Sequence, residues 1–263
     1  MQTVKIGTRG SRLALAQAEL AAGAFRAAGF AAEIKIVRTR GDEDIRSSLA
    51  EIGRGAFTDV FSDLIARGEI DVAVHSAKDL PTGEEKDGFF CLPRADARDA
   101  LVRVIGREIH TVGTGSPRRA AAASRLCPNA KVLPVRGNVD TRIEKMLRGE
   151  FDALILAQAG LDRLGFTDER VKIEPIPPEL LVPAACQGII AVEGEAGRFV
   201  ADEAAGRAAQ IERACQRALG GSCTGGAGAY FDGAVLYAQL EGRIAQTEYG
   251  GAESIALLAG RLA

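Results

Sequence analysis

The sequence lacks an excess of basic charge, a long apolar run and a histidine-rich segment. Its 263 residues include 33 lysines and arginines against 35 acidic residues, a formal net charge of -2, and its pI is about 5.9. A protein that binds nucleic acid normally shows a basic stripe and a high pI, so we expect no nucleic acid among its partners. Two histidines, His75 and His110, also offer too few ligands for a histidine-based metal site.

Segments that would take the chain into or across a membrane are missing too. No apolar run approaches the roughly 18 residues of a membrane span, and the first residues lead into a strand and an amphipathic helix without a secretory apolar segment. We therefore expect a cytoplasmic location and no membrane partner. The five cysteines are an odd number at irregular spacing without a Cys-x-x-Cys pair, which argues against a disulfide framework and a bound structural metal.

The chain does have enough hydrophobic residues, 47%, to bury a substantial core in roughly two or three compact units. Short apolar strands alternate with helical stretches in two successive sets, which predicts an α/β fold. The expected strands are 4–8, 33–39, 70–75, 100–105, 111–114, 131–135 and 151–157. The expected helices are 11–28, 57–67, 116–126 and 139–148.

Each set opens with glycine and a hydroxyl residue where a strand leads into a helix. The first reads Ile-Gly-Thr-Arg-Gly-Ser-Arg from residue 6, and the second reads Val-Gly-Thr-Gly-Ser-Pro-Arg-Arg from residue 112. Ser116 suits an N-cap and Pro117 suits the first helical position. Because the first N–H groups of a helix attract anions, this turn with Arg118 and Arg119 predicts an anion-binding site.

Arginines gather at these turns although the whole chain is slightly acidic. Arg9 follows the first strand, and Arg136 and Arg142 enclose another strand-to-helix segment. Guanidinium groups pair bidentately with carboxylates and phosphates, so the pattern favours a ligand with several such groups. For any single segment, the alternative is solvated surface charge or a tightly packed turn. If the two sets form separate lobes, the ligand would bind in the crevice outside the carboxyl ends of their strands.

Asp79 stands just after an apolar strand, in the segment Val-Ala-Val-His-Ser-Ala-Lys-Asp-Leu-Pro that ends at Pro81. The proline stops regular strand pairing. A carboxylate at a strand end can accept hydrogen bonds from a substrate and stabilise positive charge on it. The alternatives are a turn-forming aspartate or a surface ion pair with Lys78. We expect His75 to be structural.

The chain changes character at about residue 207. An expected helix, 207–219, breaks into a glycine-rich segment around Cys223, and expected strands 229–231 and 235–240 flank an Asp-Gly turn. A thiol on such a loop is accessible and can form a covalent bond. The alternative for a lone cysteine is the commoner one, a buried and inert side chain.

Taken together, these segments resemble the porphobilinogen deaminase family, whose motifs occur here in order along nearly the whole chain. So many matches in one order are more specific than any single motif. The matching segments are 6–9 (Ile-Gly-Thr-Arg), 39–42 (Thr-Arg-Gly-Asp), 55–57 (Gly-Ala-Phe), 74–81 (Val-His-Ser-Ala-Lys-Asp-Leu-Pro), 98–100 (Arg-Asp-Ala), 112–119, 136–138 (Arg-Gly-Asn), 157–164, 183–188 and 221–223 (Gly-Ser-Cys).

The resemblance implies two α/β lobes of the periplasmic-binding-protein type and a small α+β C-terminal domain. We expect 1–92 with 189–206 as lobe 1, 97–182 as lobe 2 and 207–263 as the cofactor-attachment domain. The implied activity is that of a monomeric hydroxymethylbilane synthase of tetrapyrrole biosynthesis. It would condense four porphobilinogen molecules head to tail with release of ammonia, on a dipyrromethane cofactor held by a thioether to Cys223.

The resemblance also implies the site residues. Asp79 would be catalytic, because a fixed carboxylate favours the electron-poor cation left when ammonia departs. The cofactor-binding residues would be Cys223, Ser76, Lys78, Thr114, Gly115, Ser116, Arg118, Arg119, Arg136, Arg142 and, near the hinge between the lobes, Gln187. The substrate-binding residues would be Arg9, Ser11, Arg54, Phe57, Arg136 and Arg142. The acetate and propionate arms of the pyrroles make the growing chain a polycarboxylate, which suits these arginines.

Some positions depart from the family pattern. Glu51 and Arg54 stand where two lysines are usual, and of these two only Arg54 can keep a contact to an anion. Gly115 replaces a serine, and Thr-Gly-Gly replaces Gln-Val-Pro after Cys223. Two other functions therefore stay open. One is a non-catalytic, two-lobed carboxylate-binding protein, and the other is a degenerate relative that no longer loads its cofactor.

Overall fold

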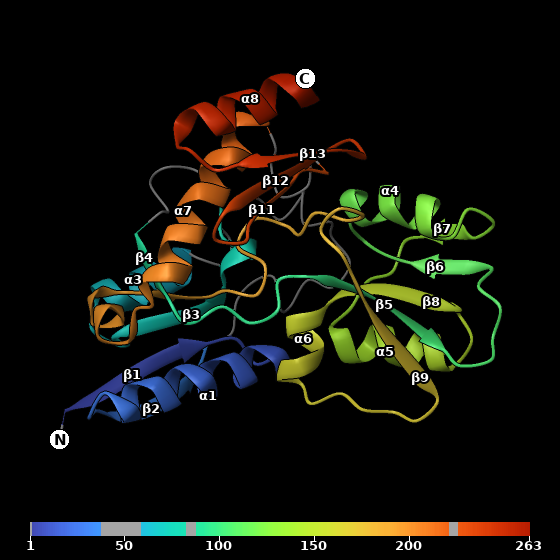
Figure 1. Cartoon of the computed structure of the whole chain (residues 1–263). Coiled ribbons are helices and arrows are strands. Elements are labelled where there is room, and N and C mark those ends of the chain that lie inside the picture. Colours follow the sequence, from blue (N-terminus) through green and yellow to red (C-terminus); the bar gives the residue numbers. More distant parts are fainter. Residues whose placement is uncertain (1, 38–58, 83–87, 221–225) are drawn as a thin grey trace. The chain divides into compact units, whose positions relative to one another are not determined.

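The chain forms two compact units in the computed structural model, which describes residues 2–37, 59–82, 88–220 and 226–263 (Figure 1). The first unit comprises Met1–Arg94 and Ile189–Arg207, and the second comprises Ala95–Gly188 and Ala208–Ala263. The last passage between the units falls inside helix α7 (Glu203–Ala218). The division into three domains, with a boundary after residue 206, remains a prediction.

The first unit is built on a five-stranded mixed sheet in the order β2-β1-β3-β10-β4. Its strands are β1 (Thr3–Thr8), β2 (Ala31–Ile36), β3 (Val72–Ser76), β4 (Phe89–Cys91) and β10 (Ile190–Glu193). Strands β1, β2 and β3 are parallel, whereas β10 is antiparallel to both of its neighbours. The helices of this unit are α1 (Arg12–Ala27), α3 (Asp59–Ala66) and the 3₁₀ helices η1 (Ala77–Asp79) and η3 (Glu195–Val200).

Helix α1 and strand β1 show why this sheet forms. Ser11 caps α1 by accepting a hydrogen bond from Ala14 N at 3.3 Å. The buried face of the helix is made of Ala18, Ala21, Ala22 and Phe25, which pack in one core with side chains of β1, β3 and β10. Small alanines let the helix lie close to the strands. Gly7 of β1 leaves room for Ile70, whose Cδ1 would lie only 2.5 Å from a Cβ at position 7.

The second unit repeats this topology in a sheet ordered β7-β6-β8-β5-β9. Its strands are β5 (Asp99–Val104), β6 (Thr111–Gly113), β7 (Lys131–Leu133), β8 (Ala153–Ala157) and β9 (Val171–Ile176), and its helices are α4 (Pro117–Leu126), α5 (Val139–Leu147) and α6 (Gln158–Arg163). Strands β6, β7 and β8 are parallel, and β5 is antiparallel to both β8 and β9. The α/β class expected from the sequence is confirmed, with one five-stranded mixed sheet in each of the two units.

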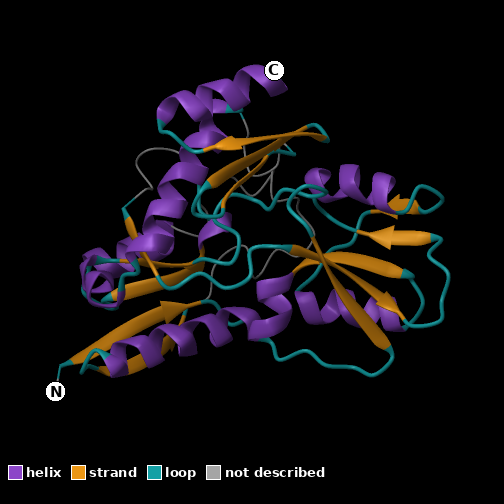
Figure 2. Ribbon diagram, viewed as in Figure 1, coloured by secondary structure: helices purple, strands orange, loops and turns teal. Residues whose placement is uncertain are grey.

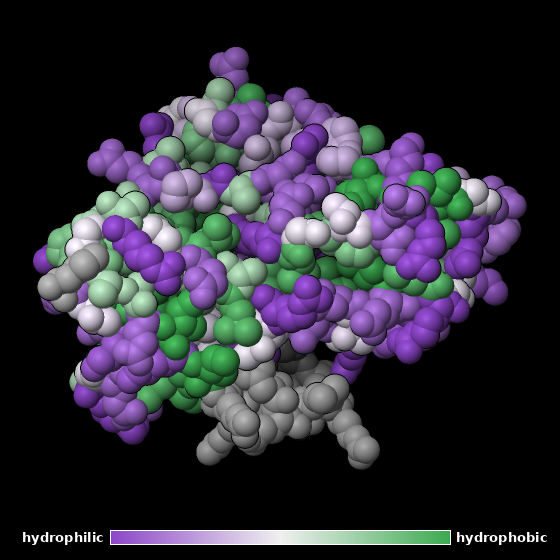
Figure 3. Space-filling view, turned by 90° about the horizontal axis from the view of Figure 1, so that it is seen from below, coloured by the Kyte–Doolittle hydropathy of each residue, from purple (hydrophilic) through white to green (hydrophobic). Residues whose placement is uncertain are grey.

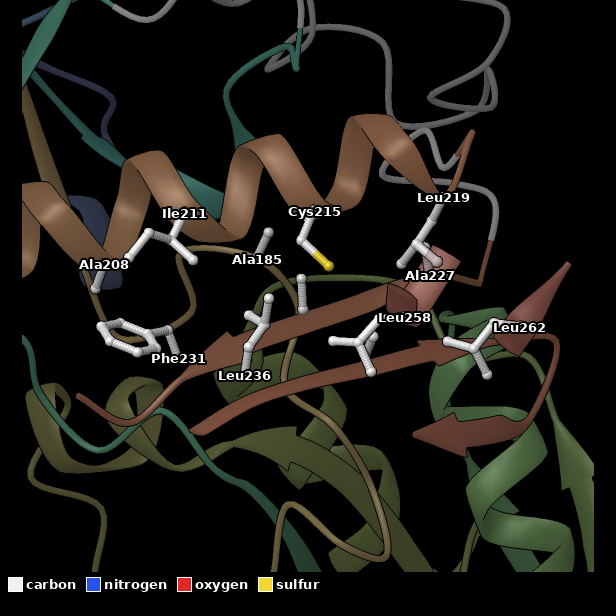
Figure 4. Close-up of a cluster of buried hydrophobic side chains, with 12 residues drawn as sticks. Ala185, Ala208, Ile211, Cys215, Leu219, Ala227, Phe231, Leu236, Leu258 and Leu262 are labelled. Atoms are coloured by element: carbon white, nitrogen blue, oxygen red, sulfur yellow. The ribbon is translucent and has the colours of Figure 1, made fainter. Parts of the chain in front are cut away.

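The C-terminal residues of the second unit add a three-stranded antiparallel sheet of β11 (Gly228–Phe231), β12 (Val235–Leu240) and β13 (Arg243–Glu248). Helices α7 and α8 (Ala252–Leu262) share its core. In Figure 4, Ile211 and Cys215 of α7 face Leu236, and Leu258 of α8 completes the cluster. Burial, with a smaller effect of the Glu212 charge, raises the pKa of the Cys215 thiol to about 12. This cysteine is therefore an inert part of the core.

Most expected elements are present, and Figure 2 shows the alternation of helices and strands. The expected strand 131–135 ends at Leu133, because Pro134 cannot donate to a strand ladder. The expected helix 207–219 begins earlier, at Glu203. Residues 38 and 39 of the expected strand 33–39 lie outside the described residues. The sequence did not predict β4, β9, β10, β13, α6 or α8.

In the part of the chain that the structure describes, no helix is both long and apolar enough to cross a bilayer. Polar and apolar side chains are interspersed on the face drawn in Figure 3. The exposed large apolar side chains come from different elements and are Leu20, Ile36, Ile105, Leu133, Leu180, Phe199 and Leu257.

Candidate functional site

In the first unit, predicted site residues lie at the carboxyl ends of two neighbouring parallel strands. Strands β1 and β3 pair with Gly7 opposite Ala73, so Arg9 and Ser11 follow β1 at the edge of the sheet where β3 ends in Ser76. The Ser76 Oγ accepts a hydrogen bond from Gln17 Nε2 of α1 at 2.8 Å. Two segments far apart in the sequence are thus brought to one sheet edge, the usual position of ligand-binding residues in open α/β sheets.

Lys78 and Asp79 lie in the single turn η1 that follows β3. The turn is closed by Leu80 N, which donates to Ala77 O at 3.2 Å. Asp79 is exposed, and its carboxylate makes no hydrogen bond or ion pair with any described residue. In particular, the ion pair with Lys78 that the sequence left open does not form between these two described side chains. The carboxylate is therefore available to an external partner.

His75 is held by structural contacts within the first unit. Its Nε2 lies 3.4 Å from Glu193 Oε2 of β10, and its ring meets Phe61 of α3 edge to face with centroids 5.0 Å apart. Ser62 Oγ donates to Glu193 Oε1 at 2.6 Å. These contacts connect β3, β10 and α3, in agreement with the structural role expected for this histidine.

In the second unit, Thr114, Gly115 and Ser116 form the turn between β6 and α4. Ser116 is the N-cap of α4, with its Oγ accepting from Arg119 N at 3.5 Å, and Pro117 takes the first helical position, as predicted. The Thr114 Oγ1 accepts from Ser116 N at 3.2 Å. The turn also packs closely, because a Cβ on Gly115 would lie 3.0 Å from a backbone oxygen of the chain after β7.

The two arginines of α4 turn inward to a buried carboxylate, Asp99 of β5. Arg118 Nη1 donates to Asp99 Oδ2 and to Val182 O, each at 2.6 Å. Arg119 Nε donates to Asp99 Oδ1 at 2.9 Å. Burial alone would raise the pKa of Asp99, but the two guanidinium charges outweigh it and hold that pKa far below its usual value. Burial lowers the pKa of Arg118, and the Asp99 charge opposes this effect.

Two glutamines extend this cluster. Gln187 Nε2 donates to Asp99 Oδ1 at 3.0 Å and to Ala97 O at 2.8 Å. Gln239 of β12 accepts from Val182 N at 3.2 Å and donates to the Arg118 carbonyl at 3.3 Å. The start of α4 is thereby tied to β5, to the segment around Val182 and to the C-terminal sheet.

Sequence reasoning placed Gln187 at the site but missed Asp99 and Gln239 as partners of the arginines. One signal for Asp99 was present, since a carboxylate opens the otherwise apolar strand β5. A charge buried in a strand requires a charged or hydrogen-bonding partner. The sequence alone does not say which of the many arginines provides it.

Arg136 and Arg142 enclose the start of α5. Arg142 Nε donates to Gly137 O at 2.7 Å, while the exposed Arg136 offers its carbonyl to Lys145 Nζ at 3.4 Å. The same sheet edge carries the α4 turn, because Thr114 N donates to Leu133 O of β7 at 3.0 Å. The structure therefore brings the motifs after β6 and β7 together within the second unit.

Gly226 and Gly228 lie close to the first turn of α4 and to the segment around Val182. Cys223 itself lies outside the described residues, as do Arg54 and Phe57. A Cβ on Gly226 would lie 3.7 Å from Pro117 Cβ, and one on Gly228 would lie 2.7 Å from Val182 O. The chain therefore returns from the Cys223 segment at the turn that carries the two arginines.

Comparison with known families shows which proteins share this combination. The sequence profile described as porphobilinogen deaminase, dipyromethane cofactor binding domain, matches residues 4–202. The chain belongs to the porphobilinogen deaminase family. The dipyrromethane cofactor-binding region of that family thus includes both five-stranded sheets and every predicted site residue except Cys223.

Curated porphobilinogen deaminases support the same assignment. The protein of Corynebacterium efficiens is 43% identical over 198 residues, which cover 73% of this chain and 65% of the relative. The protein of Roseiflexus castenholzii is 42% identical over 240 residues, covering 84% of this chain and 78% of the relative. A probable porphobilinogen deaminase of Archaeoglobus fulgidus is 39% identical, covering 86% and 82%. The alignment with the Corynebacterium protein thus spans less than two thirds of that relative.

Solved structures similar to this member of the porphobilinogen deaminase family include a periplasmic domain and an ABC transporter. The VFT2 domain of BvgS from Bordetella pertussis has a TM-score of 0.43 at 15% identity, covering 75% of this chain and 84% of that one. An ABC transporter from Parabacteroides distasonis has a TM-score of 0.44 at 13% identity, covering 83% and 74%. Both scores are low.

Proposed function

We propose that the chain is a hydroxymethylbilane synthase, a transferase that condenses four porphobilinogen molecules head to tail with release of ammonia. The proposal includes a dipyrromethane cofactor in thioether linkage to Cys223. It rests on membership of the porphobilinogen deaminase family and on the donors gathered at the start of α4.

The observation that carries the proposal is the contact of Gly226 with the first turn of α4. Cys223 precedes Gly226 by only three residues in the sequence. The proposed point of attachment is therefore adjacent in the sequence to the described contact with the turn 114–119.

The donors at that turn fit a ligand with several carboxylates. The first N–H groups of α4 have no intrahelical acceptor and favour negative charge. Further donors lie on the same side of the sheet. They are the hydroxyls of Thr114 and Ser116, the Nη1 group of Arg119 and the exposed side chain of Arg136. When bound, dipyrromethane would supply the pyrrole carbon to which the next substrate unit is joined.

Asp79 supplies the charge that the reaction needs in the first unit. As ammonia leaves porphobilinogen, the ring becomes cationic and its N–H group becomes a better donor. A fixed carboxylate binds that state more tightly than the neutral substrate, which lowers the barrier. Arg9 and Ser11, at the same sheet edge, would hold the carboxylate arms of the substrate.

The remaining sequence-based assignments belong to this proposal. Ser76, Lys78, Gly115, Arg118, Arg142 and Gln187 keep their predicted places in cofactor binding, and Arg54 and Phe57 keep theirs in substrate binding. We also propose that the enzyme acts as a cytoplasmic monomer and that residues 207–263 form the cofactor-attachment domain.

Intact-mass spectrometry of the purified protein tests the proposal. Wild type should carry the mass of two linked pyrroles, give colour with Ehrlich's reagent and release ammonia from porphobilinogen. Cys223→Ala should lack the adduct. Cys127→Ala is the matched control, because Cys127 is a half-buried free thiol at the end of α4 and should leave the adduct in place.

The two alternatives give different results in the same experiment. A carboxylate-binding protein or a relative unable to load its cofactor would show the unmodified mass and no colour. A wild-type protein without the adduct would refute the proposed function.

A further inference from the structure

Asp99 lies at the centre of the arginine cluster although no sequence motif gave it a role of its own. It is fully buried in β5. Both of its oxygens are used, Oδ2 by Arg118 Nη1 at 2.6 Å, and Oδ1 by Arg119 Nε at 2.9 Å and Gln187 Nε2 at 3.0 Å. One carboxylate therefore fixes two adjacent residues of the first turn of α4.

The two arginines are held in different ways. Arg118 Nη1 is shared between Asp99 and the Val182 carbonyl, and the Arg118 side chain is 4% exposed. Arg119 has its Nε and Nη2 on Asp99 Oδ1, at 2.9 and 2.8 Å, its Nη2 also donates to Gln187 Oε1 at 3.4 Å, and its side chain is 10% exposed. A guanidinium group is a rigid, planar fork. Fixing Nε and Nη2 of Arg119 therefore sets the direction in which its Nη1 group points.

We propose that Asp99 is a positioning residue for carboxylate binding at the start of α4. It fixes Arg118 and orients the Nη1 group of Arg119, with Gln187 contacting both the shared oxygen and Arg119 Nη2. This inference rests on the proposed function, because the carboxylates concerned are those of the tethered dipyrromethane and the growing product.

A purely structural role for Asp99 predicts a different outcome. In that case the carboxylate would only neutralise two buried cations, and its replacement would reduce cofactor loading only as far as it unfolds the protein. A positioning role predicts that loading falls in molecules that remain folded. Small displacements of a binding group can change rates by about a hundredfold, so the effect is measurable.

The experiment compares Asp99→Asn and Asp99→Glu with Asp152→Asn. Asp152 is a suitable control, because it also anchors backbone in the second unit, accepting from Thr111 N at 2.9 Å and His110 N at 3.1 Å, away from the arginines. Each protein is purified in full length. The melting temperature is measured by circular dichroism, the loaded fraction by intact mass, and kcat and KM for porphobilinogen by ammonia release.

We expect Asp152→Asn to melt at a lower temperature than wild type with normal loading. Asp99→Asn should be loaded at least about tenfold less in its folded fraction. Asp99→Glu keeps the charge but displaces it, and should restore part of the loading with KM raised about tenfold and kcat changed less. If Asp99→Asn is not recovered folded, Asp99→Glu decides the question.

Wild-type loading and KM in folded Asp99→Glu would overturn the inference, as would losses of loading in the Asp99 variants that only follow their melting temperatures. Failure of the proposed function is distinguishable, since it would appear as an unmodified mass and no turnover in wild type itself.

Discussion

Asp79 is exposed on the turn after β3, whereas Asp99 is buried in β5 between two guanidinium groups. The first carboxylate has no internal partner within the described residues, so it can interact with a ligand that gains positive charge. The second already has its full set of partners and can act only through them. At the scale of single residues, burial and pairing therefore distinguish the proposed catalytic role of Asp79 from the proposed positioning role of Asp99.

Asp79→Asn should keep the fold and the adduct but lose turnover by about a hundredfold to a thousandfold, because a neutral amide cannot stabilise the developing cation. Ammonia release under single-turnover conditions measures the loss. Asp71→Asn is the control, since Asp71 lies just before the other end of β3 and its carboxylate accepts from Lys5 N at 2.7 Å. Turnover near the wild-type rate in Asp79→Asn would show that the residue has another role.

The buried pair of charges also predicts how stability depends on pH. The pKa of Asp99 is lowered in the folded state, so its contribution is fully present above the unfolded value of about 3.9 and is lost as pH falls below it. Urea unfolding followed by circular dichroism between about pH 2 and 7 should show this loss in wild type. Asp99→Asn should be less stable at pH 7 by about 3–5 kcal/mol, because the arginines lose their partner, and its stability should fall less at low pH. If the free energy of unfolding decreased equally with falling pH in wild type and in Asp99→Asn, this account would be contradicted.

At the scale of elements, the sequence predicted helix starts most accurately, because these depend on residues that are neighbours in the chain. The cap at Ser116, the proline at the start of α4 and the cap at Ser11 depend on residues next to one another and are as expected. Several edge strands were missed, and so was the inner strand β10. Strand β9 contains Pro175, which argues against a strand except at the edge of a sheet, where β9 lies. Strand β13 is polar and also at an edge.

The candidate site was predictable as a set of arginines but not as a network. Neighbouring residues such as Thr114 and Ser116 indicate the start of a helix. The pairing of Arg118 with Asp99 and Val182 joins residues 19 and 64 positions apart, and only the folded chain reveals it. The 4% exposure of the Arg118 side chain likewise depends on the folded chain and not on its neighbours in the sequence.

The turn at Gly115 gives a prediction about an element boundary. The family pattern has serine here, but a Cβ would approach the Val135 carbonyl to 3.0 Å. Gly115→Ser should therefore destabilise the second unit by about 1–3 kcal/mol, because the close approach of the turn to the chain after β7 must widen. Gly10→Ser is the control, since a Cβ there meets Ile36 Cγ2 at an ordinary 3.5 Å. Chemical unfolding measures the free energy of unfolding of both variants. Equal values would show that the turn widens without loss of stability.

At the scale of the whole molecule, the passages of the chain between its units are constrained backbone. Gly188 has φ +86°, and a Cβ there would lie 2.5 Å from Ala95 O. Gly188→Ala should therefore lower the free energy of unfolding by more than the roughly 1–2 kcal/mol that left-handed backbone strain alone would cause. Gly165→Ala isolates that strain, because Gly165 has φ +57° with nothing within 4 Å of a Cβ. In thermal melts, Gly188→Ala should lower the melting temperature more than Gly165→Ala does. Equal decreases in the two variants would exclude a steric contribution at Gly188.

Strand β10 has a consequence for the order in which the protein is made. It lies between β3 and β4 in the sheet of the first unit, yet it is encoded after residue 188. During synthesis, the N-terminal 94 residues therefore leave the ribosome without a central strand of their sheet, while all five strands of the next sheet, from β5 to β9, emerge before β10 is available. We expect a fragment ending at Arg94 to resist neither protease nor denaturant until a peptide containing 189–207 is supplied. We expect a nascent chain stalled before β10 is translated to depend on chaperones, although it already contains strand β1 and the capped helix α1.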